Sequence, residues 1–242
     1  MDREVRAVRP PVYVALDVPT RDDALRLVRA LGGRATHYKV GLELYLAAGG
    51  PLVEELVGLG KHVFLDLKFC DIPNTVGAAA RQAARLGVDL FTVHAMGGAA
   101  TLRAAVEAAE EVNESACALA VTALTSLRDD DLAAIGFCPA PMVEHVMRLA
   151  GLAQQTGVHG VVCSADEAAV LRAAFPGLAR LVPGIRPTGA QAGDQARMAT
   201  PRAAVQAGAD YLVVGRPVTR AADPDAALRA IWSEIDAVIS SE

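Results

Sequence analysis

The chain has 242 residues, of which 52% are hydrophobic, 21% charged and only 4% aromatic, and its net charge at pH 7 is −5. This length is normal for one α/β barrel, and the shortage of aromatic residues predicts a core of Ala, Val and Leu. A mildly acidic chain without a basic cluster argues against a nucleic-acid partner. No segment approaches the roughly 20 apolar residues of a membrane span. Residues 1–11 contain no signal-peptide stretch, so we expect a cytoplasmic protein that does not engage a membrane.

Short apolar runs alternate with helix-like segments along the whole chain. Strands are predicted at Val12–Leu16, His37–Val40, His62–Leu67, Leu90–His94, Ala116–Thr122, Gly160–Cys163, Arg180–Pro183 and Tyr211–Val214. Helices are predicted at 21–31, 51–60, 73–87, 99–112, 141–156, 165–175, 201–207 and 224–239. Nearly continuous apolar strands are typical of parallel strands that are buried on both faces. Eight strand–helix units predict an α/β fold, a single (β/α)8 TIM barrel over residues 1–242, with an open doubly wound sheet as the alternative.

Metal and cofactor motifs are missing from the sequence. The four cysteines are scattered and form no Cys-x-x-Cys pair, so we expect buried or partly buried free thiols at Cys70, Cys117, Cys138 and Cys163. His94 ends the fourth predicted strand, and we interpret it as a structural histidine. We find neither metal-ligand spacing nor a glycine-rich dinucleotide motif, and therefore expect no metal and no cofactor.

Charged residues gather where the first three predicted strands end, which is the face on which barrel enzymes carry their active sites. Asp66 and Lys68 are two residues apart in one strand, so alternation places them on one face. Opposite charges inside a barrel are costly to desolvate unless they are paired. A structural ion-pair network is one interpretation. We favour the other, a catalytic array with an ionised carboxylate and a proton-donating lysine, formed by Asp17, Lys39, Asp66, Lys68 and Asp71.

Polar residues also follow three later strands. Gly215 and Arg216 come directly after the eighth strand, and the loop 186–197 follows the seventh. Phosphate sites in barrels commonly use these two loops, and an arginine offers a fork of donors that matches phosphate. Gly-Arg-Pro alone is compatible with a simple turn, but beside Arg186 and Gln195 it predicts a phosphate site. After the fifth strand, the hydroxyls of Thr125 and Ser126 either cap a helix or contact a ligand.

One segment resembles the signature of a known enzyme family. The run Asp66-Leu67-Lys68-Phe69-x-Asp71-Ile72-Pro73-Asn74-Thr75 is similar to that of orotidine 5′-phosphate decarboxylases. The resemblance extends from Leu16-Asp17 to Gly215-Arg216 and beyond, nearly the whole chain, with several separated motifs in the same order. The chain departs from its relatives at Cys70 and at Val182, where many bacterial members carry Thr before the Pro.

The resemblance implies a cofactor-free decarboxylase that converts orotidine 5′-monophosphate (OMP) to UMP. It implies a homodimer with shared active sites, in which the segment from Asp71 to Thr75 reaches into the neighbouring subunit. The implied catalytic residues are Lys68, Asp66, Asp71 and Lys39. The implied substrate-binding residues are Asp17 and Lys39 for ribose, Asp66 for the leaving carboxylate, Thr75 from the neighbouring subunit, Thr125 above Ser126 for the base, and Arg186, Gln195, Gly215 and Arg216 for phosphate.

Two rival functions share these features. The first is a Mg²⁺-dependent lyase of the same suprafamily, a keto-sugar-phosphate decarboxylase or hexulose-phosphate synthase, whose members resemble Asp-x-Lys-x-x-Asp. Those enzymes tend to carry an acidic metal ligand where Lys39 stands, and the Gly-Asp-Gln sequence of the 186–197 loop also argues against them. The second is a catalytically silent phosphate-binding barrel, which the intact Asp66, Lys68 and Asp71 set disfavours.

Overall fold

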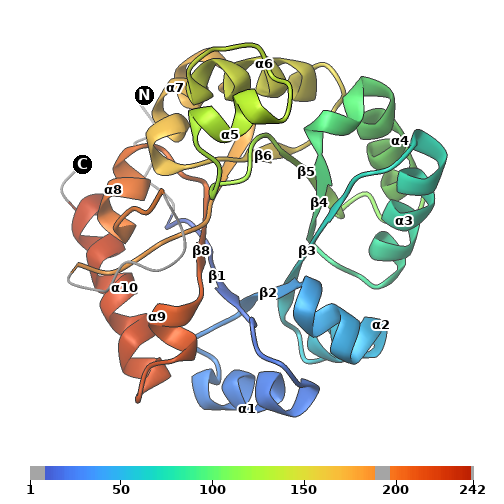
Figure 1. Cartoon of the computed structure of the whole chain (residues 1–242). Helices are drawn as coiled ribbons and strands as arrows, with labels where there is room; N and C mark the ends of the chain where they lie inside the picture. Colours follow the sequence, from blue (N-terminus) through green and yellow to red (C-terminus); the bar gives the residue numbers. More distant parts are fainter. Residues whose placement is uncertain (1–8, 189–196, 241–242) are drawn as a thin grey trace, which may run out of the picture.

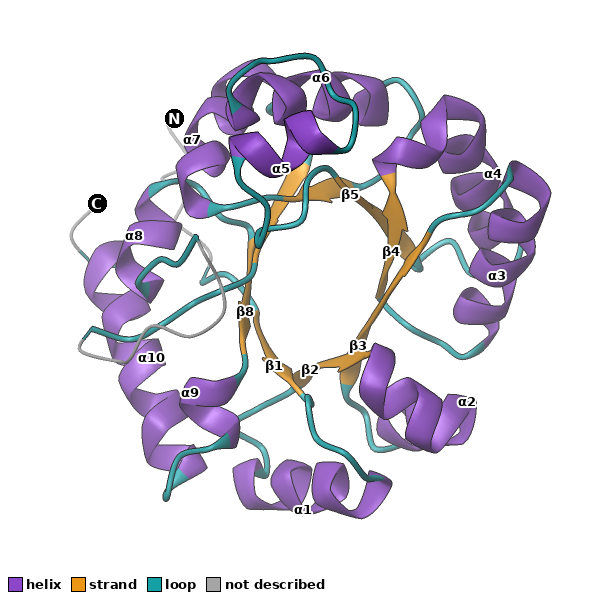
Figure 2. Ribbon diagram, in the orientation of Figure 1, coloured by secondary structure: helices purple, strands orange, loops and turns teal. Residues whose placement is uncertain are grey.

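A closed ring of eight parallel strands forms the centre of the molecule, in the order β1 to β8, and helices surround it (Figure 1). The structure is a computed structural model that describes residues 9–188 and 197–240. Figure 2 shows the strands as an inner ring and the helices as an outer one. Each strand pairs in parallel with the next, and β8 closes the ring on β1. The predicted TIM barrel is therefore confirmed.

The elements follow the predicted order. The strands are β1 (Val12–Ala15), β2 (His37–Gly41), β3 (His62–Phe69), β4 (Leu90–His94), β5 (Cys117–Val121), β6 (Gly160–Val162), β7 (Ala179–Val182) and β8 (Tyr211–Val214). The longer helices are α1 (Arg21–Leu31), α2 (Leu42–Gly58), α3 (Pro73–Arg85), α4 (Gly98–Glu110), α6 (Met142–Gln154), α7 (Ala165–Ala174) and α10 (Pro224–Ile239). Shorter helical turns are η1 (Ala95–Gly97), α5 (Asp129–Ala134), α8 (Pro201–Gln206) and α9 (Arg216–Thr219).

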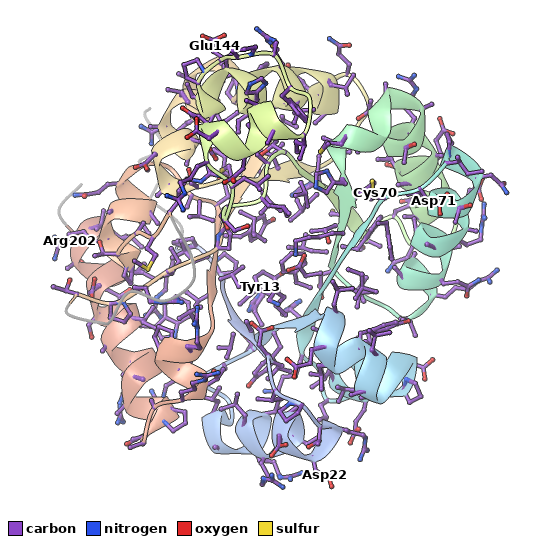
Figure 3. All side chains as sticks on the ribbon, in the orientation of Figure 1. Tyr13, Asp22, Cys70, Asp71, Glu144 and Arg202 are labelled. Atoms are coloured by element: carbon purple, nitrogen blue, oxygen red, sulfur yellow. The ribbon has the colours of Figure 1, made fainter. Side chains whose placement is uncertain are left out.

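Side-chain alternation along the strands builds two separate cores. In β1, Val12 and Val14 point outward into the large cluster beneath the helices, whereas Tyr13 and Ala15 point into the barrel. The inner cluster is small and is completed by single residues from other strands, such as Phe64, Leu119 and Leu181. Figure 3 shows Tyr13 near the centre of the ring. This filled interior leaves space for a ligand only above its last layer, at the ends of the strands.

Several local predictions were wrong. Helix α2 begins at Leu42, well before Pro51, and it continues across a kink at Gly49, whose φ of 65° a glycine adopts without strain. The turns α5 and α9 were not predicted, since four to six residues carry too little periodicity. Cys70 and Cys138 are exposed rather than buried, although all four cysteines are free thiols. Among the described residues, no helix is long and apolar enough to cross a membrane.

Candidate active site

The inward face of the first three strands ends in charged side chains. In β1 the inward residues Tyr13 and Ala15 are followed, two residues later, by Asp17. In β2, Tyr38 and Val40 belong to the outer core, so Lys39 between them faces inward. In β3, Phe64 belongs to the inner core and Asp66 follows it by two residues. Strand alternation therefore carries one carboxylate, one ammonium and a second carboxylate to the same end of the barrel.

Lys68 reaches this group through an irregularity in β3. The pairing of β3 with β4 shifts between Leu65 and Phe69, and Lys68 has a φ of 50°. A positive φ is uncommon for a residue with a side chain and is concentrated at functional sites. We predicted a regular strand that ends at Leu67. The observed strand is longer and bulged, yet Asp66 and Lys68 still meet, as predicted.

The four side chains form an alternating chain of charges. Lys39 Nζ lies 2.9 Å from Asp17 Oδ1 and 3.7 Å from Asp66 Oδ2. Lys68 Nζ donates a hydrogen bond to the other oxygen, Asp66 Oδ1, at 2.7 Å. The side chains of Lys39 and Asp66 are 11% and 14% exposed, so water screens this central pair only weakly. Each carboxylate is neutralised by an ammonium, which offsets the cost of burying the charges.

Gly41 provides the room for Lys39. A Cβ atom at this position would lie 2.9 Å from Lys39 Nζ and 3.4 Å from Asp17 Oδ1. Contacts below 3.0 Å are not tolerated, so any side chain at position 41 displaces the ammonium. The glycine is therefore part of the charged site, although it has no functional group of its own.

Thr92 on β4 is a site residue that the sequence analysis missed. Its hydroxyl donates to Asp66 Oδ1 at 3.1 Å and accepts a hydrogen bond from the Lys68 backbone N–H at 2.9 Å. The residue is fully buried. One hydroxyl thus holds both the central carboxylate and the strained backbone of Lys68. The only sequence signal was a polar residue inside an otherwise apolar strand, which by itself is compatible with a buried threonine that bonds a neighbouring backbone.

A cavity of about 270 Å³ opens above these charges. Its floor is the last layer of the inner core, which includes Ala15, Phe64 and Val213. Asp17, Lys39, Asp66 and Lys68 form one side of the wall, and residues that follow β5, β7 and β8 complete it. A cavity of this kind, with an apolar floor and a few converging polar groups, is typical of a small-molecule site.

The predicted binding residues fall into three groups. Thr125, Arg186, Gly215 and Arg216 line the cavity together with the four charged residues. Ser126, Asp71 and Thr75 are exposed and do not line it. Gln195 lies outside the described residues. The structure thus brings four of the five predicted charges together within one chain and leaves Asp71 apart.

Asp71 lies outside the ring of strands, beside α3 and α4 (Figure 3). Its Oδ1 accepts a hydrogen bond from the Ile72 N–H at 2.6 Å, and its carbonyl accepts one from Thr101 Oγ1. In the described part of the chain it forms no ion pair with a lysine or arginine. This position follows from the local sequence, because Pro73 opens α3 and turns the chain outward immediately after β3.

The two arginines line the cavity from the segments that follow β7 and β8, which are neighbours in the barrel. Arg186 follows β7, is 9% exposed, and donates from Nη1 to the Ile185 carbonyl at 2.9 Å. Arg216 is the first residue of α9, whose preceding residue is Gly215. Two guanidinium groups at one end of a cavity attract an anion, and the fork geometry of arginine suits phosphate. Val182, the departure noted in the sequence, points into the outer core, and its neighbour Leu181 lines the cavity instead.

His94 lies beside the site and lines a smaller, mostly apolar cavity that shares Ala123 and Leu124 with the main one. Burial and, to a smaller extent, the nearby Lys68 ammonium lower the pKa of His94. A neutral imidazole at this position neither competes with Lys68 for the carboxylate nor repels it. Among the described residues, no three His, Cys, Asp or Glu side chains are placed to hold a metal ion.

Known proteins share both the sequence and the fold. Residues 10–231 match the orotidine 5′-phosphate decarboxylase / HUMPS family. The chain is 52% identical over 229 residues to an orotidine 5′-phosphate decarboxylase of Halorhodospira halophila, covering 94% of this chain and 97% of the relative. It is 48% identical over 230 residues to that of Pseudomonas aeruginosa, covering 95% and 99%. A crystal structure of the Lactobacillus acidophilus enzyme aligns with a TM-score of 0.85 at 38% identity, covering 94% of this chain and 99% of that one. The chain belongs to the orotidine 5′-phosphate decarboxylase / HUMPS family.

Proposed function

We propose that this protein is a carboxy-lyase that converts OMP to UMP and CO2, the last step of de novo pyrimidine synthesis, in the cytoplasm. The observation that carries the proposal is the alternating chain Asp17–Lys39–Asp66–Lys68 along one wall of a cavity that also contains two arginines. The high identity to enzymes named orotidine 5′-phosphate decarboxylase supports the choice of substrate.

The two ends of the cavity match the two ends of the nucleotide. Arg186, Gly215 and Arg216, together with Gln195, bind the phosphate, since the guanidinium groups supply charge and the glycine exposes its backbone N–H. Asp17 and Lys39 bind the ribose hydroxyls. The pyrimidine then lies over Ala15, Phe64 and the neighbouring apolar floor, with Thr125 contacting its polar edge. Ser126, which does not line the cavity, is not needed for this contact.

The charged wall carries out the chemistry. Asp66 lies against the substrate carboxylate, so the bound ground state contains two adjacent negative charges. When the bond from C6 to the carboxylate breaks, CO2 leaves and the electron pair stays at C6. The Lys68 ammonium stabilises this developing negative charge and then transfers a proton from Nζ to C6, giving UMP. Lys68 recovers its proton from water. Lys39 and Thr92 keep Asp66 and Lys68 in place throughout.

We further propose that the barrel acts as a homodimer in which Asp71 and Thr75 complete the partner's site. Asp71 lies outside the ring of strands and does not line the cavity of its own subunit (Figure 3). Exposed apolar side chains follow three neighbouring strands on the same end of the barrel, namely Leu42 after β2, Ile72 after β3 and Met96 after β4. Such side chains favour burial against another protein surface. A two-fold dimer through this surface would bring each Asp71 to the other subunit.

The geometry favours this reaction over the Mg²⁺-dependent alternative. Lys39 Nζ already lies between the oxygens of Asp17 and Asp66, at 2.9 and 3.7 Å. A divalent cation at the same carboxylates would be repelled by this ammonium. The residues present therefore suit a substrate that needs positive charge at fixed positions, without a metal bridging the two aspartates.

The test is an assay of purified protein with OMP in EDTA, in which loss of orotate absorbance measures turnover. The proposal predicts equal activity with EDTA and with added Mg²⁺. Activity on a keto-sugar phosphate that requires Mg²⁺, with none on OMP, would contradict it.

A further inference from the structure

Arg197 connects three strand ends of the barrel that are far apart in the sequence. It lies after β7 and before α8, and its side chain is 17% exposed. Its Nη1 pairs with Glu167 Oε1, and its Nη2 donates to the Leu124 carbonyl at 3.1 Å. Its buried Nε has no hydrogen-bond partner in the described part of the chain. The guanidinium is therefore held by its two terminal nitrogens, one to each neighbour.

Glu167 anchors this arginine to a rigid element. The Glu167 side chain is only 5% exposed, and its Oε2 accepts a hydrogen bond from the Ser164 N–H at 2.7 Å. Ser164 caps α7 in a reciprocal capping box with Glu167, directly after β6. Because both oxygens of the carboxylate are engaged, the position of Arg197 Nη1 is determined by the first turn of α7.

Leu124, by contrast, belongs to the loop that follows β5. Leu124 and Thr125 follow β5 and line the cavity, yet Leu124 is 36% exposed. The hydroxyl of Thr122 donates to the Val162 carbonyl, which ties the chain to β6 only up to this point. Beyond it, the Leu124 carbonyl accepts two hydrogen bonds: one from the Leu127 N–H at 3.0 Å, which closes a local turn, and one from Arg197 Nη2, which ties this turn to α7 through Glu167.

We propose that Arg197 is a positioning residue for the base end of the cavity. It is held in place by Glu167 at the first turn of α7, and it holds the backbone of Leu124 and Thr125, which line the cavity. The inference rests on the proposed function, in which Thr125 contacts the pyrimidine. Arg197 itself does not line the main cavity. Its loss should therefore affect binding of the base and spare binding of the phosphate.

The experiment uses three competitive inhibitors of OMP turnover, namely UMP, uridine and ribose 5-phosphate. In Arg197→Lys the charge beside Glu167 stays, but a single ammonium replaces the fork that also reaches Leu124. Glu167→Gln loosens the same anchor without leaving an unpaired buried carboxylate. Arg180→Lys is the control, because Arg180 is also a largely buried arginine, 8% exposed, and pairs with Asp210 and the Gly208 and Leu178 carbonyls at the opposite end of the barrel.

We expect Arg197→Lys to raise the inhibition constants of UMP and uridine about tenfold, the loss that one charge-assisted hydrogen bond predicts. The constant for ribose 5-phosphate should stay within about twofold, and Glu167→Gln should show the same pattern. Arg216→Ala should show the reverse pattern, weakening UMP and ribose 5-phosphate but not uridine. Arg180→Lys should change none of the three.

Equal losses for all three inhibitors in Arg197→Lys and Glu167→Gln, or no loss in either, would overturn the inference. So would a base-selective loss in the control Arg180→Lys. If the wild-type protein does not decarboxylate OMP, the proposed function fails, and that result is separate from any inhibitor pattern of the variants.

Discussion

Lys39 joins two carboxylates from different strands, and its position depends on a neighbour with no side chain. A substitution at Gly41 displaces the Lys39 ammonium without touching the core. It therefore tests whether the position of this charge matters for activity, separately from protein stability. The atom that a new Cβ would meet is the end of a flexible side chain, which moves easily. Displacing it separates Lys39 from Asp17 and Asp66 while leaving the surrounding core unchanged.

Gly41→Ala should therefore lower kcat/KM for OMP at least about tenfold, the value of one charge-assisted contact. The melting temperature should change little, because φ at Gly41 is −100°, which alanine adopts freely. Gly58→Ala is the control, since a Cβ there meets no atom within 4 Å. Steady-state kinetics and thermal unfolding of both variants check this. Full activity of Gly41→Ala would show that the position of Lys39 is unimportant.

Thr92 allows a second test at the scale of a single hydroxyl. Thr92→Val keeps the shape but removes both the donor to Asp66 and the acceptor for the Lys68 N–H. We expect a loss of stability of about 1–3 kcal/mol and a decrease in kcat of about tenfold or more. Thr156→Val, which removes a buried hydroxyl bonded to the Ala153 carbonyl, should lose stability without losing kcat. Parallel effects on kcat in both variants would assign Thr92 a purely structural role.

At the scale of elements, the sequence predicted the features that follow from regular hydrophobic periodicity, namely the eight strands and the longer helices between them. Asp17 and Lys39 were predicted at the ends of neighbouring strands, and they do lie together there, because β1 and β2 are regular. Local sequence could not predict the register shift of β3 against β4, where the Lys68 N–H bonds to Thr92 of the neighbouring strand. The contact from Arg197 to Leu124 joins residues 73 positions apart and leaves no local pattern. Tertiary contacts of this kind decided every feature of the site that the sequence analysis missed.

The opposite end of the barrel contains a histidine pair that makes stability depend on pH. His37 on β2 stacks on His62 of β3 at 4.3 Å between ring centroids. Burial, followed by repulsion from His62, lowers the pKa of His37 to about 4 from its ordinary 6.5. Between these values the unfolded chain binds the proton and the folded chain does not. The stability that neutral His37 contributes is therefore fully present above pH 6.5 and is lost as the pH falls towards 4.

For this group the loss between pH 7 and 5 is at most about 2 kcal/mol, and partial solvent exposure reduces it. His37→Phe keeps an aromatic ring beside His62 and removes the titration. Urea unfolding at both pH values should show a smaller pH-dependent loss in this variant than in the wild type. Identical losses would mean that His37 does not cause the pH dependence.

At the scale of the whole molecule, the cavity of one barrel is lined by four of the five predicted charged residues and by two arginines, but not by Asp71. Asp71 is exposed and lies outside the ring of strands, so it does not line the cavity of its own chain. The proposed dimer explains this position, since each subunit would supply Asp71 to the other. The sequence resemblance implied that the sites are shared. The position of Asp71 in the single chain is compatible with such sharing, because the residue is exposed and outside its own cavity.

Subunit mixing tests the sharing. Lys68→Ala and Asp71→Ala should each be nearly inactive alone. After exchange, a mixed dimer carries both changes in one site and neither in the other. Random exchange makes about half of the dimers mixed, so activity should recover to roughly a quarter of the wild-type value. Absence of recovery, with mass spectrometry proving exchange, would mean that each site is built from one chain.

In the proposed reaction this cavity decarboxylates OMP and Lys68 delivers a proton to C6. The most direct measurement is turnover of OMP in D2O with EDTA, followed by NMR of the product at C6. The wild-type protein should form UMP with one deuterium at C6, because the Lys68 ammonium exchanges with solvent, and release one CO2 per UMP. Lys68→Ala, folded normally by circular dichroism, should be slower by at least about 10²-fold. Unchanged OMP with the wild-type protein, or deuterated UMP formed at a similar rate by Lys68→Ala, would contradict the claim.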